Sequence, residues 1–341
     1  MAAIRVVQWT TGNVGQRSVL AVCDRDDLEL VGVYAWSPEK VGREIGGVVA
    51  TNDIDALLAT KPDCVIYNPM WSSTDELVRI LEAGVNVVST AAFINGDKSP
   101  EDRDRIAKAC EAGGASMFGT GISPGFIELL AIASAGVCDR IDKLTVFEQA
   151  DTTMYDSPAT ELAAGFGQPI DNPDLPAMAA SGTAVFGEAV ALLADALGVE
   201  LDEVVCESEF AQTTEDLVMD HWTIAAGHVA GMIVRWLGRV GGREVVELNM
   251  KWRKGSTLEP DWPIDMGHTI EVDGRPTIRT KVEFMPPADF PATSFADFMV
   301  LGHIMTAVPA NNAIPLVVAA APGIVTYNDL GLPVPRGWVP R

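Results

Sequence analysis

The sequence has few of the residues that build metal centres and disulfide frameworks. Its 341 residues include four histidines and five cysteines. The cysteines lie far apart without a Cys-x-x-Cys pair, and the histidines lack the close spacing of metal ligands. We therefore expect no metal site and no disulfides, and we interpret the cysteines as buried, reduced thiols.

Basic residues are also scarce. Against 47 Asp and Glu stand only 24 Lys and Arg, which gives a formal charge of −23. Such a charge repels phosphate backbones and anionic lipid surfaces, so we expect no nucleic-acid partner. The same field would favour cationic substrates such as amines, although an acidic surface more often serves solubility.

The chain lacks long uninterrupted apolar runs and a targeting segment. Its apolar stretches, such as AIPLVVAAAPGIV from residue 313, are short and broken by proline, and no basic segment followed by an apolar one opens the sequence. We expect a cytoplasmic protein without a membrane partner. A hydrophobic content of 48% over 341 residues suits a packed globular protein of two domains.

The first 120 residues alternate short apolar strands with amphipathic helices. This pattern predicts a doubly wound parallel sheet of the Rossmann type, with helices on both faces. We expect Gly84 and Gly113 to cap two of the helices. The predicted strands are 4–9, 29–36, 64–69, 86–90 and 115–120, and the predicted helices are 15–23, 54–59, 73–83 and 100–112.

After Pro124 the pattern changes to strands without helices between them. This change predicts an inserted α+β domain built on a mostly antiparallel sheet, with a hairpin at the Asp-Gly of EVDGRPT. From Ser294 the chain becomes helical again, which indicates a return to the first domain. The predicted domains are a dinucleotide-binding domain 1–125, a substrate and dimerisation domain 126–293 and a C-terminal helical segment 294–341.

The stretch IRVVQWTTGNVGQ predicts a dinucleotide-binding turn. A strand ends at Trp9, Gly12 leaves room for a phosphate, and Gly15 permits close packing of the following helix. These are the second and third glycines of Gly-x-Gly-x-x-Gly, whereas Thr10 replaces the first. The residues of the turn expected to hold the cofactor are Thr11, Gly12, Asn13, Val14 and Gly15.

The end of the second predicted strand bears on which dinucleotide is bound. An NAD site usually places a carboxylate there, whereas a 2′-phosphate needs a hydroxyl and a cation. Ser37 and Lys40 occupy this region, so we favour NADP as the cofactor, with NAD as the alternative. Two later turns, around Asn68-Pro69 and Gly121-Ile122, follow strands at positions suited to the nicotinamide or to helix initiation.

The motifs TTGNVG, YAWSPEKVG, VIYNP, GTGISPGF and NNAIPLVVAAAPGI occur in this order. With them the chain resembles, from about residue 4 to 330, the NAD(P)-dependent oxidoreductases related to 2,4-diaminopentanoate dehydrogenase and the native amine dehydrogenases. Their actinobacterial members are often labelled dihydrodipicolinate reductase-like. The resemblance implies a homodimer and a small-molecule substrate between the domains. It also implies that the nicotinamide side is held by Asn68, Pro69, Thr90, Gly121 and Asn312.

Two departures from the family pattern bear on the reaction. True dihydrodipicolinate reductases carry a His-His pair, which this sequence lacks, so that activity is not expected. The amine-forming members carry a glutamate just after the fourth strand, where this chain reads STAAFIN. Candidates for proton transfer must then come from the inserted domain, and we select Glu148, Tyr155 and Asp156.

The sequence thus predicts an enzyme, an NAD(P)H-dependent oxidoreductase that transfers a hydride to or from a small carbonyl, imine or amine. The alternative is a cofactor-binding sensor or regulatory protein that has lost catalysis, which the missing glutamate would suit. Turnover of any carbonyl, amine or imine would distinguish the two.

Overall fold

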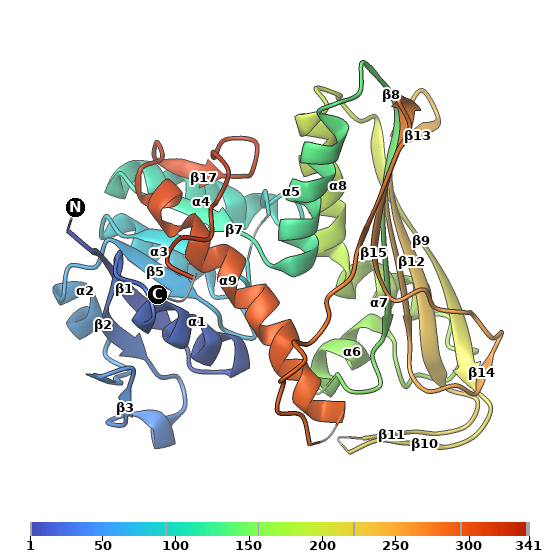
Figure 1. The fold of residues 1–341 in the computed structure, drawn as a ribbon, viewed down its shortest axis with the longest axis horizontal. Helices are drawn as coiled ribbons and strands as arrows, with labels where there is room; N and C mark the ends of the chain where they lie inside the picture. Colours follow the sequence, from blue (N-terminus) through green and yellow to red (C-terminus); the bar gives the residue numbers. More distant parts are fainter. Residues whose placement is uncertain (1, 93, 156, 221, 294, 339–341) are drawn as a thin grey trace. The chain divides into compact units, whose positions relative to one another are not determined.

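The computed structural model describes residues 2–92, 94–155, 157–220, 222–293 and 295–338 (Figure 1). The chain divides into two compact units. Unit 1 comprises Met1–Phe126 and Val300–Arg341, and unit 2 comprises Ile127–Met299. The C-terminal segment therefore belongs to the same unit as the N-terminal one, and the chain of unit 2 is inserted between them.

Unit 1 contains a parallel sheet with the strand order β17-β7-β6-β5-β1-β2. β5 and β7 are buried along their whole length, as expected for strands that helices cover on both faces. This arrangement confirms the predicted doubly wound Rossmann fold. Its strands are β1 (Ile4–Trp9), β2 (Leu28–Tyr34), β5 (Cys64–Tyr67), β6 (Asn86–Ser89), β7 (Ser116–Gly119) and β17 (Gly323–Val325).

The helices of unit 1 lie close to their predicted positions. One core cluster joins the sheet to the helices that follow β4, β5 and β6, and within it the rings of Trp9 and Tyr34 stack with centroids 4.2 Å apart. The helices are α1 (Asn13–Cys23), α2 (Ile54–Ala59), α3 (Thr74–Glu82), α4 (Pro100–Gly113) and α9 (Met299–Val318), and a small hairpin pairs β3 (Glu44–Ile45) with β4 (Val48–Val49).

Two details of unit 1 differ from the sequence predictions. The stretch expected to continue the last helix instead forms β17, which pairs in parallel with β7 at the edge of the sheet. Gly113 was predicted to cap α4, but the cap is Gly114, whose φ is +67°. Gly113 meets a different requirement, because a Cβ on it would lie 1.8 Å from the carbonyl oxygen of Leu81.

Unit 2 is built on a second sheet, in the order β14-β9-β12-β13-β8-β15-β16. Only β13 and β8 pair in parallel among its described neighbours, so the prediction of a mostly antiparallel sheet is confirmed. The strands are β8 (Arg140–Asp151), β9 (Glu203–Thr213), β12 (Val229–Val240), β13 (Arg243–Arg253), β14 (Leu258–Glu259), β15 (Gly267–Arg275) and β16 (Ile278–Val282), and a separate hairpin joins β10 (Leu217–Val218) to β11 (Thr223–Ile224).

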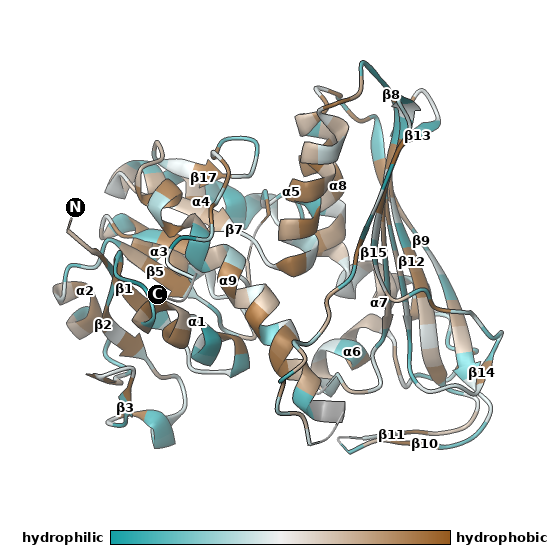
Figure 2. Cartoon of the chain, viewed as in Figure 1, coloured by the Kyte–Doolittle hydropathy of each residue, from teal (hydrophilic) through white to brown (hydrophobic). Residues whose placement is uncertain are grey.

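The two faces of this sheet have different chemistry. The apolar helices α5 (Ile127–Ala135) and α8 (Ala184–Ala196) pack on one face (Figures 1 and 2). On that face the Trp236 indole donates to the Thr183 hydroxyl at 3.0 Å, and Phe186 packs against Trp252. Two short helices, α6 (Pro158–Ala164) and α7 (Leu175–Gly182), lie between β8 and α8 in the chain. The opposite face carries ion pairs.

These ion pairs centre on the buried Glu247. Its carboxylate accepts from Lys143 Nζ at 2.6 Å and from Arg235 Nε at 2.9 Å. Burial alone would raise the pKa of Glu247, but the hydrogen bonds from Arg235 and Lys143 outweigh it and lower the pKa from 4.5 to about 2. The ionised form of Glu247 is therefore favoured by folding.

The hairpin predicted at EVDGRPT is present, but its turn lies further along the chain. β15 continues to Arg275 and β16 begins at Ile278, so the turn is at Pro276 and Thr277. Gly274 instead lies at a bulge against β8, where a Cβ would be 2.2 Å from the carbonyl oxygen of Arg140. Close approach of two backbones, rather than the turn, thus requires this glycine.

Helix α9 is long and apolar enough to cross a membrane by length and composition alone. Its buried Asn311 donates from the side chain to the carbonyl of Ser18 at 3.1 Å, and Arg25 Nη1 donates to the Asn311 carbonyl at 3.2 Å. Both partners belong to unit 1. We therefore interpret α9 as a helix that packs within the Rossmann unit.

The pKa of Glu247 leads to a prediction about acid stability. Because its pKa is lower in the folded than in the unfolded state, its contribution is complete above pH about 4.5 and is lost as the pH falls toward about 2. The unfolding free energy of the wild type should fall as the pH is lowered from about 4.5 to about 2. In Glu247→Gln we expect this fall to be smaller by up to about 3 kcal/mol. Urea unfolding at a series of pH values measures this slope.

The control for this prediction is Glu111→Gln, which changes an exposed carboxylate on α4. Its stability should vary with pH as that of the wild type does. Parallel curves for Glu247→Gln and the wild type between pH about 4.5 and about 2 would contradict the assignment.

Candidate functional site

The strands of unit 1 end in one row at the carboxyl edge of the sheet. The register pairs Tyr34 with Trp9, Trp9 with Tyr67, Tyr67 with Ser89 and Ser89 with Gly119. The predicted cofactor residues that directly follow these strands therefore share one edge, where ligands of open α/β sheets bind. They are Thr11 to Gly15, Ser37, Asn68, Pro69, Thr90, Gly121 and Ile122.

The first residue of the β1–α1 turn explains how threonine replaces the usual glycine. Thr10 has a φ of +72°, a left-handed conformation that glycine adopts without strain and other residues rarely do. Its hydroxyl donates to the carbonyl of Asn68 at 2.9 Å, and its carbonyl accepts from Gln8 Nε2 at 3.0 Å. The fold thus holds Thr10 in the conformation that the missing glycine would have supplied.

The two remaining glycines have different surroundings. A Cβ on Gly15 would lie 2.4 Å from the carbonyl oxygen of Thr10, so α1 can approach β1 this closely only with glycine there. A Cβ on Gly12 would meet nothing within 4 Å. Gly12 thus opens onto space beside the turn, as a residue facing a phosphate must.

The start of α1 is suited to an anion. Gly12 is its N-cap residue, no side chain in the described part of the chain caps the helix, and the first turn contains no acidic residue. Backbone N–H groups at a helix start and the helix dipole both favour negative charge. Together with the open space at Gly12, this arrangement fits a pyrophosphate.

Lys40 brings a cation to the same turn. It ends the short helix η1 (Pro38–Lys40), and its Nζ donates to the carbonyl of the buried Thr11 at 2.9 Å. Ser37, at the start of η1, is half-buried and makes no side-chain capping bond within the described residues. The structure therefore brings the predicted cation and hydroxyl to the end of β2, beside the glycine turn.

The predicted nicotinamide role of Asn68 stays a prediction, and its side chain makes hydrogen bonds to neighbouring strands. Its Oδ1 accepts from Gln8 Nε2 at 2.8 Å, and its Nδ2 donates to Thr90 Oγ1 at 2.8 Å. The side chain therefore joins the ends of β1, β5 and β6 instead of projecting from the sheet edge. Through these contacts Asn68 would contribute to cofactor binding by positioning Thr10 and Thr90. Pro69, which follows Asn68 at the edge of the sheet, is half-buried.

The turn after β7 is held by the C-terminal segment. The hydroxyls of the buried Thr120 and Tyr327 lie 2.6 Å apart, and Phe126 N donates to the carbonyl of Gly121 at 3.0 Å. Ile122 begins the irregular helical turn η2 (Ile122–Phe126). Gly121 and Ile122 thus lie at the carboxyl edge of the sheet. Their turn is held by a local backbone hydrogen bond and by Tyr327 of the C-terminal segment.

No hydrogen bond of Asn312 among the described residues places it at the carboxyl edge of the sheet. Its Oδ1 accepts from Arg25 Nη1 at 3.1 Å and from the Trp338 indole at 3.3 Å. Arg25 follows the C-terminal end of α1, whereas the glycine turn precedes the N-terminal end. The nicotinamide role implied for Asn312 therefore stays a prediction, with the side chain engaged elsewhere.

The loop after β6, where the family glutamate is missing, is ordered by a serine. Ser89 Oγ accepts from the backbone N–H groups of Ala91 and Ala92, each at 3.0 Å. Phe93 lies outside the described residues. The described part of residues 89–95 supplies no carboxylate to this edge.

Among the predicted catalytic residues, Glu148 is the one that the structure places in a polar cluster. Its Oε1 accepts from the Trp252 indole at 2.8 Å, and its Oε2 lies 3.3 Å from Nε2 of His268. His268 is only 8% exposed, and its buried Nδ1 has no hydrogen-bond partner among the described residues. Such a pair, with a carboxylate on one ring nitrogen, is suited to proton transfer.

The structure gives less information on the other two catalytic candidates. Tyr155 is 39% exposed, and its backbone N–H donates to the Thr152 carbonyl at 3.0 Å. Asp156 lies outside the described residues. His268 is not among the predicted catalytic residues, because its proximity to Glu148 comes from the pairing of β15 with β8. The alternation of HTIEV was the available signal that His268 points to the buried face.

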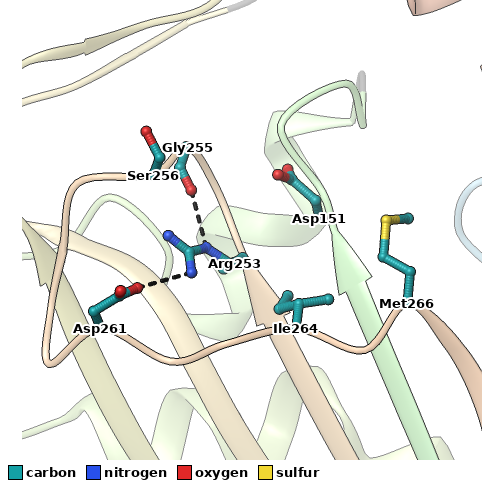
Figure 3. A pocket seen from close by; sticks show the side chains of 7 residues that line it. All are labelled: Asp151, Arg253, Gly255, Ser256, Asp261, Ile264 and Met266. Carbon is teal, nitrogen blue, oxygen red and sulfur yellow. Dashed lines mark hydrogen bonds and ion pairs between the residues drawn. The ribbon is translucent and has the colours of Figure 1, made fainter.

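A cleft of about 570 Å³ lies on unit 2 at the ends of β8 and β13 (Figure 3). The Arg253 guanidinium beside it donates to Asp261 at 2.9 Å and to the Trp262 carbonyl at 2.7 Å. None of the predicted catalytic residues Glu148, Tyr155 and Asp156 is among its lining residues, so we do not place the substrate there. The lining residues are Asp151, Arg253, Gly255, Ser256, Asp261, Ile264 and Met266.

Comparison with known proteins gives concordant matches. The family described as "2,4-diaminopentanoate dehydrogenase C-terminal domain" matches residues 126–340. An amine dehydrogenase of Streptomyces virginiae is 31% identical over 97% of this chain and 96% of the relative. A 2,4-diaminopentanoate dehydrogenase of Acetoanaerobium sticklandii is 28% identical over 77% of this chain and 70% of the relative.

Among solved structures, an amine dehydrogenase from Mycobacterium smegmatis has a TM-score of 0.78 to this chain at 20% identity. The match covers 98% of each chain. It shows that the two proteins share a fold along their whole length.

The glycine turn yields a prediction that separates binding from stability. Gly12→Ala adopts an allowed φ of −70° and has room in the folded chain, so we expect a melting temperature within about 2 °C of the wild type. Its Cβ would occupy the space beside the turn and weaken dinucleotide binding about tenfold or more. Fluorescence titration with NADPH and NADH measures the affinity.

The matched variant is Gly15→Ala, in which the new Cβ would clash with the Thr10 carbonyl. We expect it to lower the melting temperature by about 4 °C or more, because α1 must move away from β1. Unchanged dinucleotide affinity in Gly12→Ala would mean that the phosphate lies elsewhere.

Proposed function

Because this chain belongs to the 2,4-diaminopentanoate dehydrogenase family, we propose that it is an NAD(P)-dependent oxidoreductase that interconverts a small amine and the corresponding carbonyl compound. The observation that carries this proposal is the β1–α1 turn, with open space at Gly12 and an uncapped helix start. The group that this turn fits supplies hydride transfer at the substrate carbon when it is bound.

The direct test combines binding and turnover. The wild-type protein should bind NADPH or NADH in a fluorescence titration. It should also reduce the oxidised cofactor with at least one member of a panel of short 2-aminoalkanes. Absence of binding by both cofactors would refute the proposal, whereas binding without turnover of any amine, imine or carbonyl would favour the alternative of a sensor.

We favour NADP over NAD as the cofactor. Support comes from Lys40, whose ammonium lies beside the turn, and from Ser37 at the end of β2. A 2′-phosphate gains a charge-assisted contact from a lysine, whereas the ribose hydroxyls of NAD usually need a carboxylate at this position.

The cofactor preference is tested by Lys40→Met. We expect it to weaken NADPH binding about tenfold or more and to change NADH binding less than about threefold, since only NADPH carries the extra phosphate. Lys108→Met, on the exposed surface of α4, is the control and should leave both affinities unchanged. Equal losses for both cofactors in Lys40→Met would assign Lys40 to the shape of the turn.

Amine oxidation also needs a group that removes a proton from the substrate ammonium, since a nitrogen lone pair must be available as the C–H bond breaks. We assign this role to Glu148 and His268. The contact with the Trp252 indole holds the carboxylate of Glu148, and the 3.3 Å contact orients the imidazole of His268. The chain lacks the family glutamate after β6, so the proton acceptor must come from another group, and this pair is the one that we select.

If the two residues act as a unit, their variants are not additive. We expect Glu148→Gln and His268→Asn each to lower kcat about a hundredfold or more, and the double variant to lose little beyond either single one. The NADPH dissociation constant should stay unchanged in all three. Glu271→Gln, a carboxylate on β15 paired with Arg279, is the control and should keep full kcat. If the losses were additive, the two residues would act independently, and the assignment of one proton-transfer pair would be wrong.

The expectations of a homodimer and of a cytoplasmic location stay proposals. The first is supported by the resemblance to the family, and the second by the composition of the chain.

A further inference from the structure

Unit 2 contains a lysine whose side chain is completely buried. Lys254 directly follows β13, and its side chain has an exposed fraction of 0%. Its Nζ donates to the Thr152 carbonyl at 2.5 Å and lies 2.7 Å from Oε1 of Glu161. The rings of Phe166 and Trp222 lie within 5.5 and 5.9 Å of the ammonium. Burial lowers the pKa of Lys254, and Glu161 opposes that change.

Such a pair is a poor means of stabilising a fold. The transfer of an ammonium and a carboxylate out of water costs several kcal/mol per ion, and apolar replacements of similar size are often as stable or more so. The aromatic surroundings of Lys254 would accept apolar side chains readily. The arrangement is therefore better explained by what the ammonium holds in place.

Lys254 fixes one loop at two points. Thr152 begins the segment that follows β8, and Glu161 lies in α6 at its other end. The start of the loop is further tied to β13, because Thr152 N donates to the Arg253 carbonyl at 2.8 Å and Gly255 N donates to Thr153 Oγ1 at 2.8 Å. The two ends of the loop 152–161, of which residues 152–155 and 157–161 are described, are thus joined through one buried ammonium.

The same strand also supports the proposed proton-transfer pair. Trp252, two residues before Lys254, donates to Glu148, and Glu148 lies on β8 shortly before the loop begins. Side chains two residues apart on a strand point to the same face. The end of β13 and the residue after it therefore carry, on one face of the sheet, the indole that holds Glu148 and the ammonium that holds the loop.

We propose that Lys254, through its pair with Glu161, is a positioning residue that holds the loop 152–161 in the conformation that receives the amine substrate. The inference rests on the proposed function and assigns substrate recognition to this loop, which carries the half-exposed Tyr155. Lys254 itself is too deeply buried to contact substrate.

The decisive variant replaces the pair by apolar residues, as Lys254→Met with Glu161→Leu. Because no buried charge is left without its partner, we expect a melting temperature within about 2 °C of the wild type. The Thr152 carbonyl loses its donor, so the loop is released at its first point. With the 2-aminoalkane that the wild type turns over best, we expect KM to rise about tenfold, kcat to change less than about threefold, and the NADPH dissociation constant to stay the same.

A second readout does not depend on activity. Amide hydrogen exchange within residues 152–161 should be faster in the double variant, while exchange in β8 and β13 stays slow. A double variant with wild-type KM and wild-type exchange would overturn the inference, because the pair would then have a structural role only. If the wild type turns over no amine, the proposed function fails on that ground, and the exchange measurement still decides whether Lys254 holds the loop.

Two single variants complete the design. Lys254→Met alone leaves the carboxylate of Glu161 buried without its lysine, so it should lower the melting temperature and raise KM together. Lys143→Met removes an ion pair with Glu247 on the opposite face of the same sheet. It should lower stability without changing KM or loop exchange. A change of KM in Lys143→Met equal to that in the double variant would attribute the effect to general loosening of unit 2.

Discussion

The close contact between Gly15 and the carbonyl of Thr10 is the constraint on which the arrangement of unit 1 depends. It sets the distance of α1 from β1, and Thr10, whose carbonyl makes this contact, has a left-handed backbone conformation. Gln8 and Asn68 hold that conformation through hydrogen bonds that join neighbouring strands. The uncapped start of α1 and the ammonium of Lys40 both lie at this turn, and together they are suited to an anion.

Unit 2 contains two different arrangements of buried charged side chains. On the open face of its sheet, Glu247 is surrounded by Lys143 and Arg235, and the result is a carboxylate that remains ionised well below its ordinary pKa. On the other face, Lys254 and Glu161 form an ion pair among aromatic rings. The ion pairs of Glu247 stabilise the folded state above the pH range in which Glu247 titrates. The second arrangement contributes little net stability, which is why its value lies in the position of the loop.

Much of the fold could be predicted, because local sequence patterns decide it. The apolar strands, the helices between them and the change to antiparallel pairing after Pro124 all follow from periodicity and turn residues. The errors have one physical origin. Gly113 and Gly274 were assigned to a cap and a turn, yet each is required by the backbone of a distant segment, and that proximity cannot be read from local sequence. β17 likewise became a strand through pairing with β7.

The residues of the candidate site also fall into two groups: those that local sequence predicts and those that only long-range contacts bring together. By itself the sequence determined the dinucleotide turn, the cation after β2 and the family of oxidoreductases, because these are encoded in short contiguous motifs. Only the tertiary structure decided that Glu148 meets His268 and that Lys254 ties together a loop about a hundred residues earlier in the chain. Both contacts depend on the order and register of strands in the second sheet, which are properties of long-range pairing.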